Sequence, residues 1–312
     1  MIKNWLAAGA VALTAGMTST VQAASVTQPG EQVGLAYGPL PEGVYAIDTF
    51  SIGRADARNS ADVGVNVPIL VWSTGYKVFG ATLMPVIAVP SVFVNTNNPA
   101  PLPNANVSIL YNPFIGNIFA FDLGNKISAA YLVGAYVGVG DRGSILGATP
   151  VLPQLASSSI RNTFAASYTG DGYNLTASFT HVFMVDDAAR FGGPVGAALG
   201  PIGNADGVYL DLTATKTFGK FEIGAVAFGY TDLTVNTRNP IYANYQRAGQ
   251  FAVGGLVGYD FGPFKTQIFV TREVANRAGP LAEETRGWFR VIAPLYTAQA
   301  AAAAPLPLMR KY

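Results

Sequence analysis

The chain has 312 residues, of which 50% are hydrophobic and 12% are charged. Soluble domains carry about 25% charged residues, so this chain has about half the usual charge. It contains no cysteine, which excludes a disulfide framework, a thiolate metal site and a cysteine nucleophile. The formal net charge is +1, so no electrostatic bias draws the chain toward nucleic acid.

The first 23 residues have the three-part pattern of a secretory signal peptide. Lys3 precedes a short apolar run, and the segment ends in the small-residue sequence Val21-Gln22-Ala23. We expect cleavage after Ala23 or Ala24; the alternative is an amphipathic N-terminal helix. Beyond residue 23 there is no run of 18 apolar residues, so the sequence predicts no transmembrane helix.

The rest of the chain is a series of segments in which apolar and polar residues alternate, separated by Gly, Asn, Asp and Pro. In residues 172–184, an apolar face that begins at Tyr173 alternates with a polar face that begins at Asn174. Successive side chains of a strand point to opposite faces, so this pattern predicts strands with one apolar face. The predicted strands are 43–53, 62–73, 78–94, 106–121, 126–139, 160–169, 172–184, 206–218, 220–231, 249–261, 263–274 and 284–296.

The gaps between these segments are alternately short and long, as in outer-membrane barrels with periplasmic turns and extracellular loops. The predicted fold class is therefore all-β, a single closed antiparallel transmembrane β-barrel of twelve strands. An even strand number places both termini on the periplasmic side. The predicted organisation is a signal peptide at 1–23, an N-terminal periplasmic segment at 24–42, the barrel at 43–296 and a C-terminal tail at 297–312.

Charged residues set the expected orientation of each strand, because Arg or Lys facing mid-bilayer costs about 2–4 kcal/mol. By this rule the charges point inward, together with apolar groups on the same faces, which predicts a semi-apolar lumen. Asp48 and Arg290 form a candidate ion pair where the first and last strands close the barrel. Alternatively, the charges form a salt-bridge network that plugs a narrow barrel. The predicted channel-lining residues are Asp48, Phe50, Trp72, Arg161, Asp211, Glu222, Phe228, Lys265, Phe269, Trp288 and Arg290.

Catalysis is not expected. The single histidine, His181, is predicted to face outward, and a phospholipase would need a serine beside it. Phe183, not a serine, lies two residues after His181, and Ser178 points to the opposite face. We also expect no cofactor and no metal site, since the acidic residues at strand-to-loop exits fit a solvated rim better than a Ca²⁺ site. These acidic residues are Asp141, Asp186 and Asp187.

Several stretches resemble a known family. They are "LPEGVYAIDTF" at 40–50, "VNVPILVW" at 65–72, "FGATLMPVIAVP" at 79–90 and "GWFRVIAPLY" at 287–296. Together these are similar to the outer-membrane family named for the meta pathway of phenol degradation. The resemblance implies an outer-membrane channel associated with aromatic catabolism, and it carries over no individual functional residue.

We therefore predict a channel in the bacterial outer membrane for passive uptake of small hydrophobic or aromatic compounds, linked to phenol-type aromatic degradation. The expected partners are outer-membrane lipid and the solute. The alternative is a structural or surface-interaction barrel with a plugged lumen. The identity of the substrate and the oligomeric state stay open.

Overall fold

A computed structural model describes residues 27–56, 61–96, 105–138, 157–186, 188–189, 202–233, 235, 247–277 and 283–298. The predicted signal peptide, its cleavage site, Asp141 and Asp187 lie outside these residues, as do most of the long loops and of the C-terminal tail.

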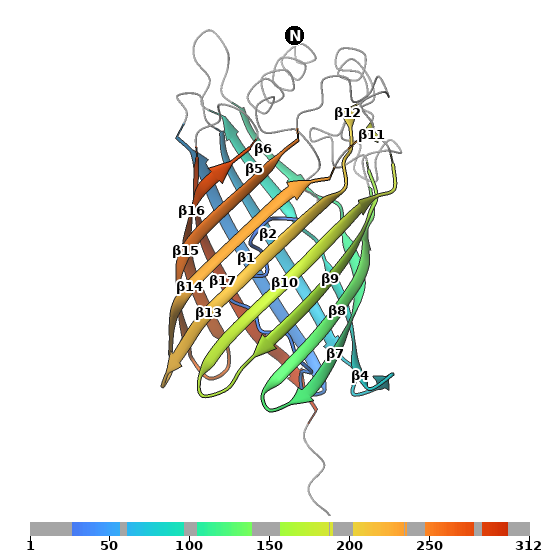
Figure 1. The fold of residues 1–312 in the computed structure, drawn as a ribbon, viewed down its shortest axis with the longest axis vertical. Helices are drawn as coiled ribbons and strands as arrows, with labels where there is room; N and C mark the ends of the chain where they lie inside the picture. The colour runs from blue at the N-terminus through green and yellow to red at the C-terminus, as the bar shows by residue number, and fades with distance from the viewer. Residues whose placement is uncertain are drawn as a thin grey trace, which may run out of the picture.

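The described chain forms a closed antiparallel barrel of twelve strand positions (Figure 1). Sequential neighbours pair around the wall, β17 pairs with β1, and the pairing of β2 with β4 completes the ring. The wall consists of β1 (Gly43–Ala55), β2 (Ala61–Ser73), β4 (Ala81–Ala88), β5 (Ser91–Thr96), β6 (Ala105–Leu110), β7 (Phe114–Gly124), β8 (Ile127–Tyr136), β9 (Ser159–Tyr168), β10 (Tyr173–Met184), β13 (Gly207–Phe218), β14 (Phe221–Asp232), β15 (Gly249–Asp260), β16 (Lys265–Asn276) and β17 (Glu284–Thr297).

The predicted fold class is confirmed, and the strand bounds agree closely with the predicted segments. Two predicted strands are each divided, 78–94 into β4 and β5, and 106–121 into β6 and β7. Proline lacks the N–H that a sheet ladder needs, and Pro90 and Pro113 lie at the two breaks. Their carbonyls still accept hydrogen bonds from the next wall segment, Pro90 from the Tyr111 amide at 2.7 Å and Pro113 from the Val137 amide at 2.9 Å.

The short connections lie together at one end of the barrel, the lower end in Figure 1. We call it the turn end. Residues 125–126, 169–172, 219–220 and 261–264 make four of these connections. The small strand β3 (Lys77–Val78) pairs with the start of β4 at the same end. Two further short strands, β11 (Ala188–Ala189) and β12 (Ile202–Gly203), pair with each other beyond the opposite end of the wall.

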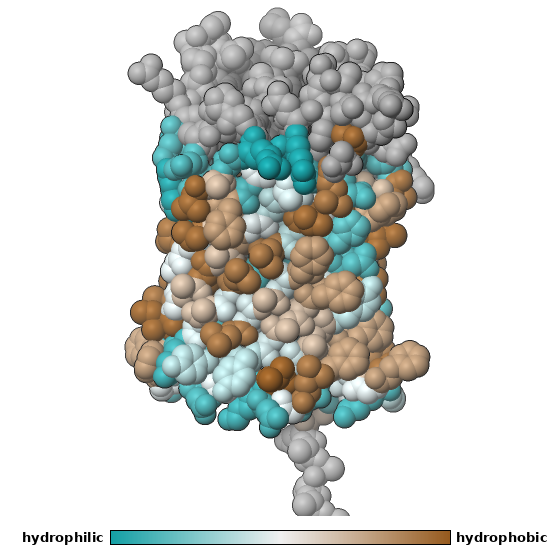
Figure 2. Space-filling view, in the orientation of Figure 1, coloured by the Kyte–Doolittle hydropathy of each residue, from teal (hydrophilic) through white to brown (hydrophobic). Residues whose placement is uncertain are grey.

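On the side of the barrel shown in Figure 2, the wall is mostly apolar around its middle and polar toward both ends. Large hydrophobic side chains such as Phe164, Phe179, Ile268 and Val270 are exposed there. This is the arrangement that a barrel in a lipid bilayer requires. Among the described residues, the structure has no helix of the length and hydrophobicity needed to span a membrane.

Residues 27–38 lie inside the barrel, and we call them the luminal segment. The segment makes successive tight turns, in which the Glu31 amide bonds the Gln28 carbonyl and the Val33 amide bonds the Gly30 carbonyl. Gly30 and Gly34 have φ near +83° and +82°, which favours glycine. The prediction of a periplasmic segment at 24–42 is therefore wrong for these residues, which contact inward-facing side chains of the wall.

Two apolar clusters line the interior. The first extends over β1, β2, β4, β5, β7, β8, β10 and β13. We call its part on β1, β2, β4, β7 and β8 the apolar wall, which includes Val67, Val71, Met84, Ile118 and Leu132. The second lies on β14 to β17 and includes Val33 of the luminal segment. It consists of Val33, Val226, Phe228, Ala252, Leu256, Phe269 and Trp288.

Candidate functional site

The luminal segment is held by polar side chains of β9 to β16. The Gly30 amide donates to Asp211 Oδ1 at 3.0 Å, and the Gly34 amide donates to Thr213 Oγ1 at 2.7 Å. The Tyr37 amide donates to Ser167 Oγ at 2.8 Å. These bonds satisfy backbone donors that would otherwise be unpaired away from water, so the segment covers the polar half of the interior.

Arg290 is the central anchor of the segment. Its side chain is 0% exposed. Its guanidinium donates to the carbonyls of Glu31 and Val33, and to Gln267 Oε1 at 3.1 Å. Arginine presents five donors in a rigid fork and so can hold two turns of backbone at once.

A second buried cation, Arg161, connects the luminal segment to β9. Arg161 forms an ion pair with Glu31, donates to Tyr136 Oη at 3.1 Å and to Thr163 Oγ1 at 3.2 Å. Its guanidinium carbon lies 5.8 Å from the centre of the Phe114 ring. The ion pair is almost fully buried, so its charges are satisfied inside the protein rather than by solvent.

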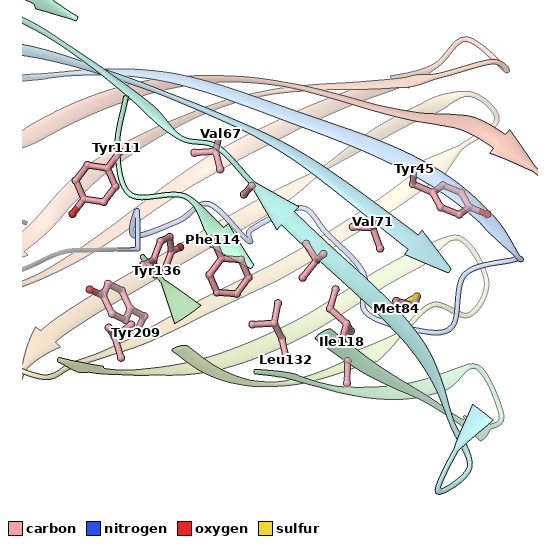
Figure 3. Close-up of a cluster of buried hydrophobic side chains, with 14 of the residues drawn as sticks. Tyr45, Val67, Val71, Met84, Tyr111, Phe114, Ile118, Leu132, Tyr136 and Tyr209 are labelled. Carbon is pink, nitrogen blue, oxygen red and sulfur yellow. The ribbon is translucent and has the colours of Figure 1, made fainter. Parts of the chain in front are cut away.

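A cavity of about 460 Å³ lies between the luminal segment and the apolar wall. Figure 3 shows several of its lining side chains pointing into the interior from the wall strands. Near its inner end are Phe114 and Tyr136, whose rings lie 4.9 Å apart. Most of its surface is aliphatic, contributed by Ile47, Val67, Ile69, Val71, Met84, Val86, Ala88, Ile118, Leu132 and Ile292.

The cavity has a polar mouth at the turn end, built from Thr169, Tyr173, Asn174, Thr217, Glu222 and Lys265. Lys265 Nζ lies 2.8 Å from Glu222 Oε2. Its side chain is 34% exposed, whereas that of Glu222 is 2% exposed. The site is thus an apolar chamber that has one ionic pair at its entrance, a form suited to small apolar molecules.

Most of the predicted channel-lining residues do point inward. Their placement is as expected, while their role in a channel remains a prediction. Seven of these side chains are buried and contact other interior residues or the luminal segment, and Lys265 lies at the cavity mouth. The seven are Arg161, Asp211, Glu222, Phe228, Phe269, Trp288 and Arg290.

The predictions for Asp48, Phe50 and Trp72 are wrong. These side chains are on the outer face, with Phe50 40% and Trp72 53% exposed. The inner face of β1 carries Thr49 and Ser51, which receive hydrogen bonds from Arg290 and Arg286. In β2, the valines on the face opposite Trp72 form part of the apolar wall.

The error has a physical cause. Both faces of β2 are largely apolar because its inner face lines the apolar half of the interior, and the inner face of β1 is mixed, with Tyr45 and Ile47 beside Thr49 and Ser51. Hydrophobic alternation therefore does not distinguish inside from outside on these strands, and the predicted orientation of β1 depends on one carboxylate, Asp48. Asp48 pairs with Val291, whereas Arg290 pairs with Thr49. The predicted Asp48–Arg290 ion pair is absent because the two side chains lie on opposite faces of the wall.

The outward placement of His181 agrees with the prediction. Its ring Nε2 lies 4.0 Å from Asp206 Oδ2, and Ser178 points inward. Asp186 receives a hydrogen bond from the Ser158 amide at the loop end of the wall. Within the described ranges, no group of three or more His, Cys, Asp or Glu side chains could hold a metal ion.

Sequence comparison identifies the family. Residues 42–291 match the family described as "Putative MetA-pathway of phenol degradation". The chain belongs to this family. The match begins at Glu42, one residue before β1, and ends within β17, so the luminal segment precedes the part of the chain that the phenol-degradation family shares. No curated protein sequence matches the chain.

Solved structures resemble this family member in fold. An outer-membrane channel from Pseudomonas putida F1 has 13% identity and a TM-score of 0.65, over 86% of this chain and 99% of that chain. The transport unit of the autotransporter AIDA-I from Escherichia coli has 10% identity and a TM-score of 0.48, over 91% and 98%. The CymD monoaromatic hydrocarbon channel has 10% identity and a TM-score of 0.41, over 84% and 90%.

Proposed function

We propose that this barrel is a channel of the bacterial outer membrane that admits small hydrophobic or aromatic compounds by passive diffusion. The observation that carries the proposal is the cavity between the luminal segment and the apolar wall. Its aliphatic lining offers no hydrogen bonds to most of a solute's surface, so it favours solutes that gain free energy by leaving water.

Family membership supports a link to phenol-type aromatic degradation, because the family is described by that pathway. The Pseudomonas putida protein of similar fold is an outer-membrane channel. The apolar belt on the outer face supports the location in a membrane. The proposed role needs no catalytic group, since the cellular consumption of the solute maintains its gradient.

The test is uptake of toluene by vesicles that contain lipopolysaccharide, with and without the folded barrel. Ala88 lines the cavity and Ala166 lies on the outer face. We expect Ala88→Phe to fill the cavity and slow uptake severalfold, and Ala166→Phe to leave the rate unchanged. Uptake no faster than in empty vesicles, or unaffected by Ala88→Phe in a folded barrel, would contradict the proposal.

A second function is favoured by the filling of the polar half of the interior by the luminal segment. In that case the barrel is a plugged structural or surface-interaction protein, whose loops bind a partner. The same uptake experiment separates the two functions, because a plugged barrel gives no uptake in any variant.

A further inference from the structure

The charged groups of the cavity lie at two different ends. The described lining contains four charged side chains, Glu31 and Arg161 at the inner end and Glu222 and Lys265 at the mouth. Aliphatic side chains occupy the space between. A solute in this cavity therefore has an apolar environment along its body and meets ionic groups only at its ends.

The ion pair at the inner end is almost fully buried. Arg161 already donates to Glu31, Tyr136 and Thr163, and the Arg161 and Glu31 side chains are 6% and 8% exposed. This pair is less accessible to a solute than the pair at the mouth, because protein covers almost all of its surface.

The ion pair at the mouth differs, because Glu222, the partner of Lys265, also accepts hydrogen bonds from other residues. Glu222 Oε1 accepts from Thr215 Oγ1 at 2.5 Å, and Oε2 accepts from Gln267 Nε2 at 2.9 Å and from Lys265. An ammonium has three donors. Among the described residues, Glu222 is the one polar partner recorded for Lys265, so the ammonium keeps donors that can face the cavity mouth.

We propose that Lys265 is a specificity-determining residue that binds the polar end of the solute. The solute class is a small aromatic compound with an apolar body and one terminal oxygen that accepts a hydrogen bond. The apolar body lies against Met84, Val86 and Ile118, and the oxygen accepts from Lys265 Nζ. A charge-assisted hydrogen bond in this partly dehydrated mouth is stronger than one in open water. This inference rests on the proposed function, since it concerns the same cavity.

Three solutes that share the same methylphenyl body test the inference. Toluene has no polar end, p-cresol has a hydroxyl and p-toluate has a carboxylate. Binding is measured by isothermal titration of the full-length mature barrel in lipid nanodiscs, with empty nanodiscs subtracted. We expect the wild type to bind p-cresol and p-toluate more tightly than toluene. Lys265→Met should weaken binding of these two by about fivefold to tenfold and leave toluene binding within about twofold.

Two matched variants serve as controls. Lys220→Met removes an exposed lysine from the β13–β14 turn, which does not line the cavity, and should leave all three affinities unchanged. Lys265→Arg keeps a cationic donor and should restore most of the preference for the oxygen-bearing solutes. Heat-dependent mobility on electrophoresis shows whether each variant is folded.

The outcomes are distinct. If Lys265→Met weakens the binding of all three solutes equally, the inference is overturned, because the residue then acts only on the shape of the cavity. Equal affinities of the wild type for all three also overturn it, while toluene binding by itself keeps the proposed function. If the folded wild type binds none of the three solutes, the proposed function fails as well. If only the binding of p-toluate depends on Lys265, the polar end that Lys265 recognises is an anion, and solutes whose polar end is a hydroxyl are excluded.

Discussion

Arg290 and Thr49 meet across the seam where the last strand pairs with the first. Arg290 Nε donates to Thr49 Oγ1 at 2.8 Å inside the barrel, and the two residues are direct neighbours in the β1–β17 register. The same guanidinium holds the carbonyls of Glu31 and Val33. One side chain thus joins the closure of the wall to the position of the luminal segment.

Removal of this anchor should destabilise the barrel. Arg290→Met keeps the apolar stem but leaves buried acceptors unpaired, which costs about 2–4 kcal/mol of unfolding free energy. Urea unfolding in lipid vesicles, followed by tryptophan emission, measures the change. Arg272→Met is the control, because Arg272 is 38% exposed near the loop end and should cost under about 1 kcal/mol. Equal losses for the two variants would contradict the role of Arg290.

The turn at Gly30 should tolerate no side chain. Its φ is +83°, and a Cβ there would lie 2.6 Å from the Phe228 ring. We expect Gly30→Ala to displace the luminal segment, so that it is cut by protease in the folded barrel. Gly219→Ala is the matched control, since φ is +62° but no atom lies within 4 Å of the added Cβ. Resistance of Gly30→Ala to the protease, equal to that of the control, would show that the segment accommodates the methyl group.

Deletion of residues 27–38 should make the barrel conduct ions. The segment covers Asp211, Thr213 and Gln267, and without it these polar groups would face an open lumen that water can fill. In planar bilayers we expect no steady conductance from the wild type and stable steps from the deletion variant. A wild type that conducts as strongly as the deletion variant would rule out the segment as the barrier to ions.

Replacement of Asp48 should stabilise the barrel. Its carboxylate is exposed on the outer face, opposite Val291 and Pro68. A carboxylate toward lipid costs less than Arg or Lys but remains unfavourable. We expect Asp48→Leu to raise the unfolding free energy in vesicles by about 1–2 kcal/mol, and Asp211→Leu to lower it because the Gly30 amide then loses its acceptor. A loss of stability in Asp48→Leu would contradict the outward placement.

Low pH should destabilise the structure near Asp56, at the loop end of the barrel, which is the end opposite the turn end. Arg272 Nη2 lies 2.7 Å from Asp56 Oδ2, and the hydrogen bond and charge of Arg272 lower the pKa of Asp56 below its ordinary value of 3.8. A lowered carboxyl pKa contributes stability that is present above the ordinary value and is lost as the pH falls through the folded-state pKa. Hydrogen exchange of the Asp56 amide, which bonds the Glu283 carbonyl, should therefore show extra opening below about pH 4. Asp56→Asn should remove this pH dependence, and an unchanged acid profile in that variant would contradict the assignment.

The interior was only partly predictable from sequence. The inward placement of Arg161, Asp211 and Arg290 followed from the cost of charge in lipid, and the structure agrees. The orientation of β1 and β2 did not follow, because Val67 and Val71 are as apolar as lipid-facing residues. The luminal segment was missed although a signal was present. Pro29-Gly30 and Gly34 are turn residues, and the inward charges of Arg161, Asp211 and Arg290 needed further partners that the wall itself did not supply.

The sequence by itself determined the twelve wall segments, the alternation of short and long connections and the membrane-facing character of most strands. These features depend on the period of two along each strand and on local turn chemistry, which neighbouring residues specify. Only the tertiary structure decided what fills the lumen and where the cavity lies. The contacts responsible join Glu31 to Arg161 and to Arg290, which are 130 and 259 residues away along the chain. No local pattern encodes such pairs, since they form only when the closed wall brings the two residues together.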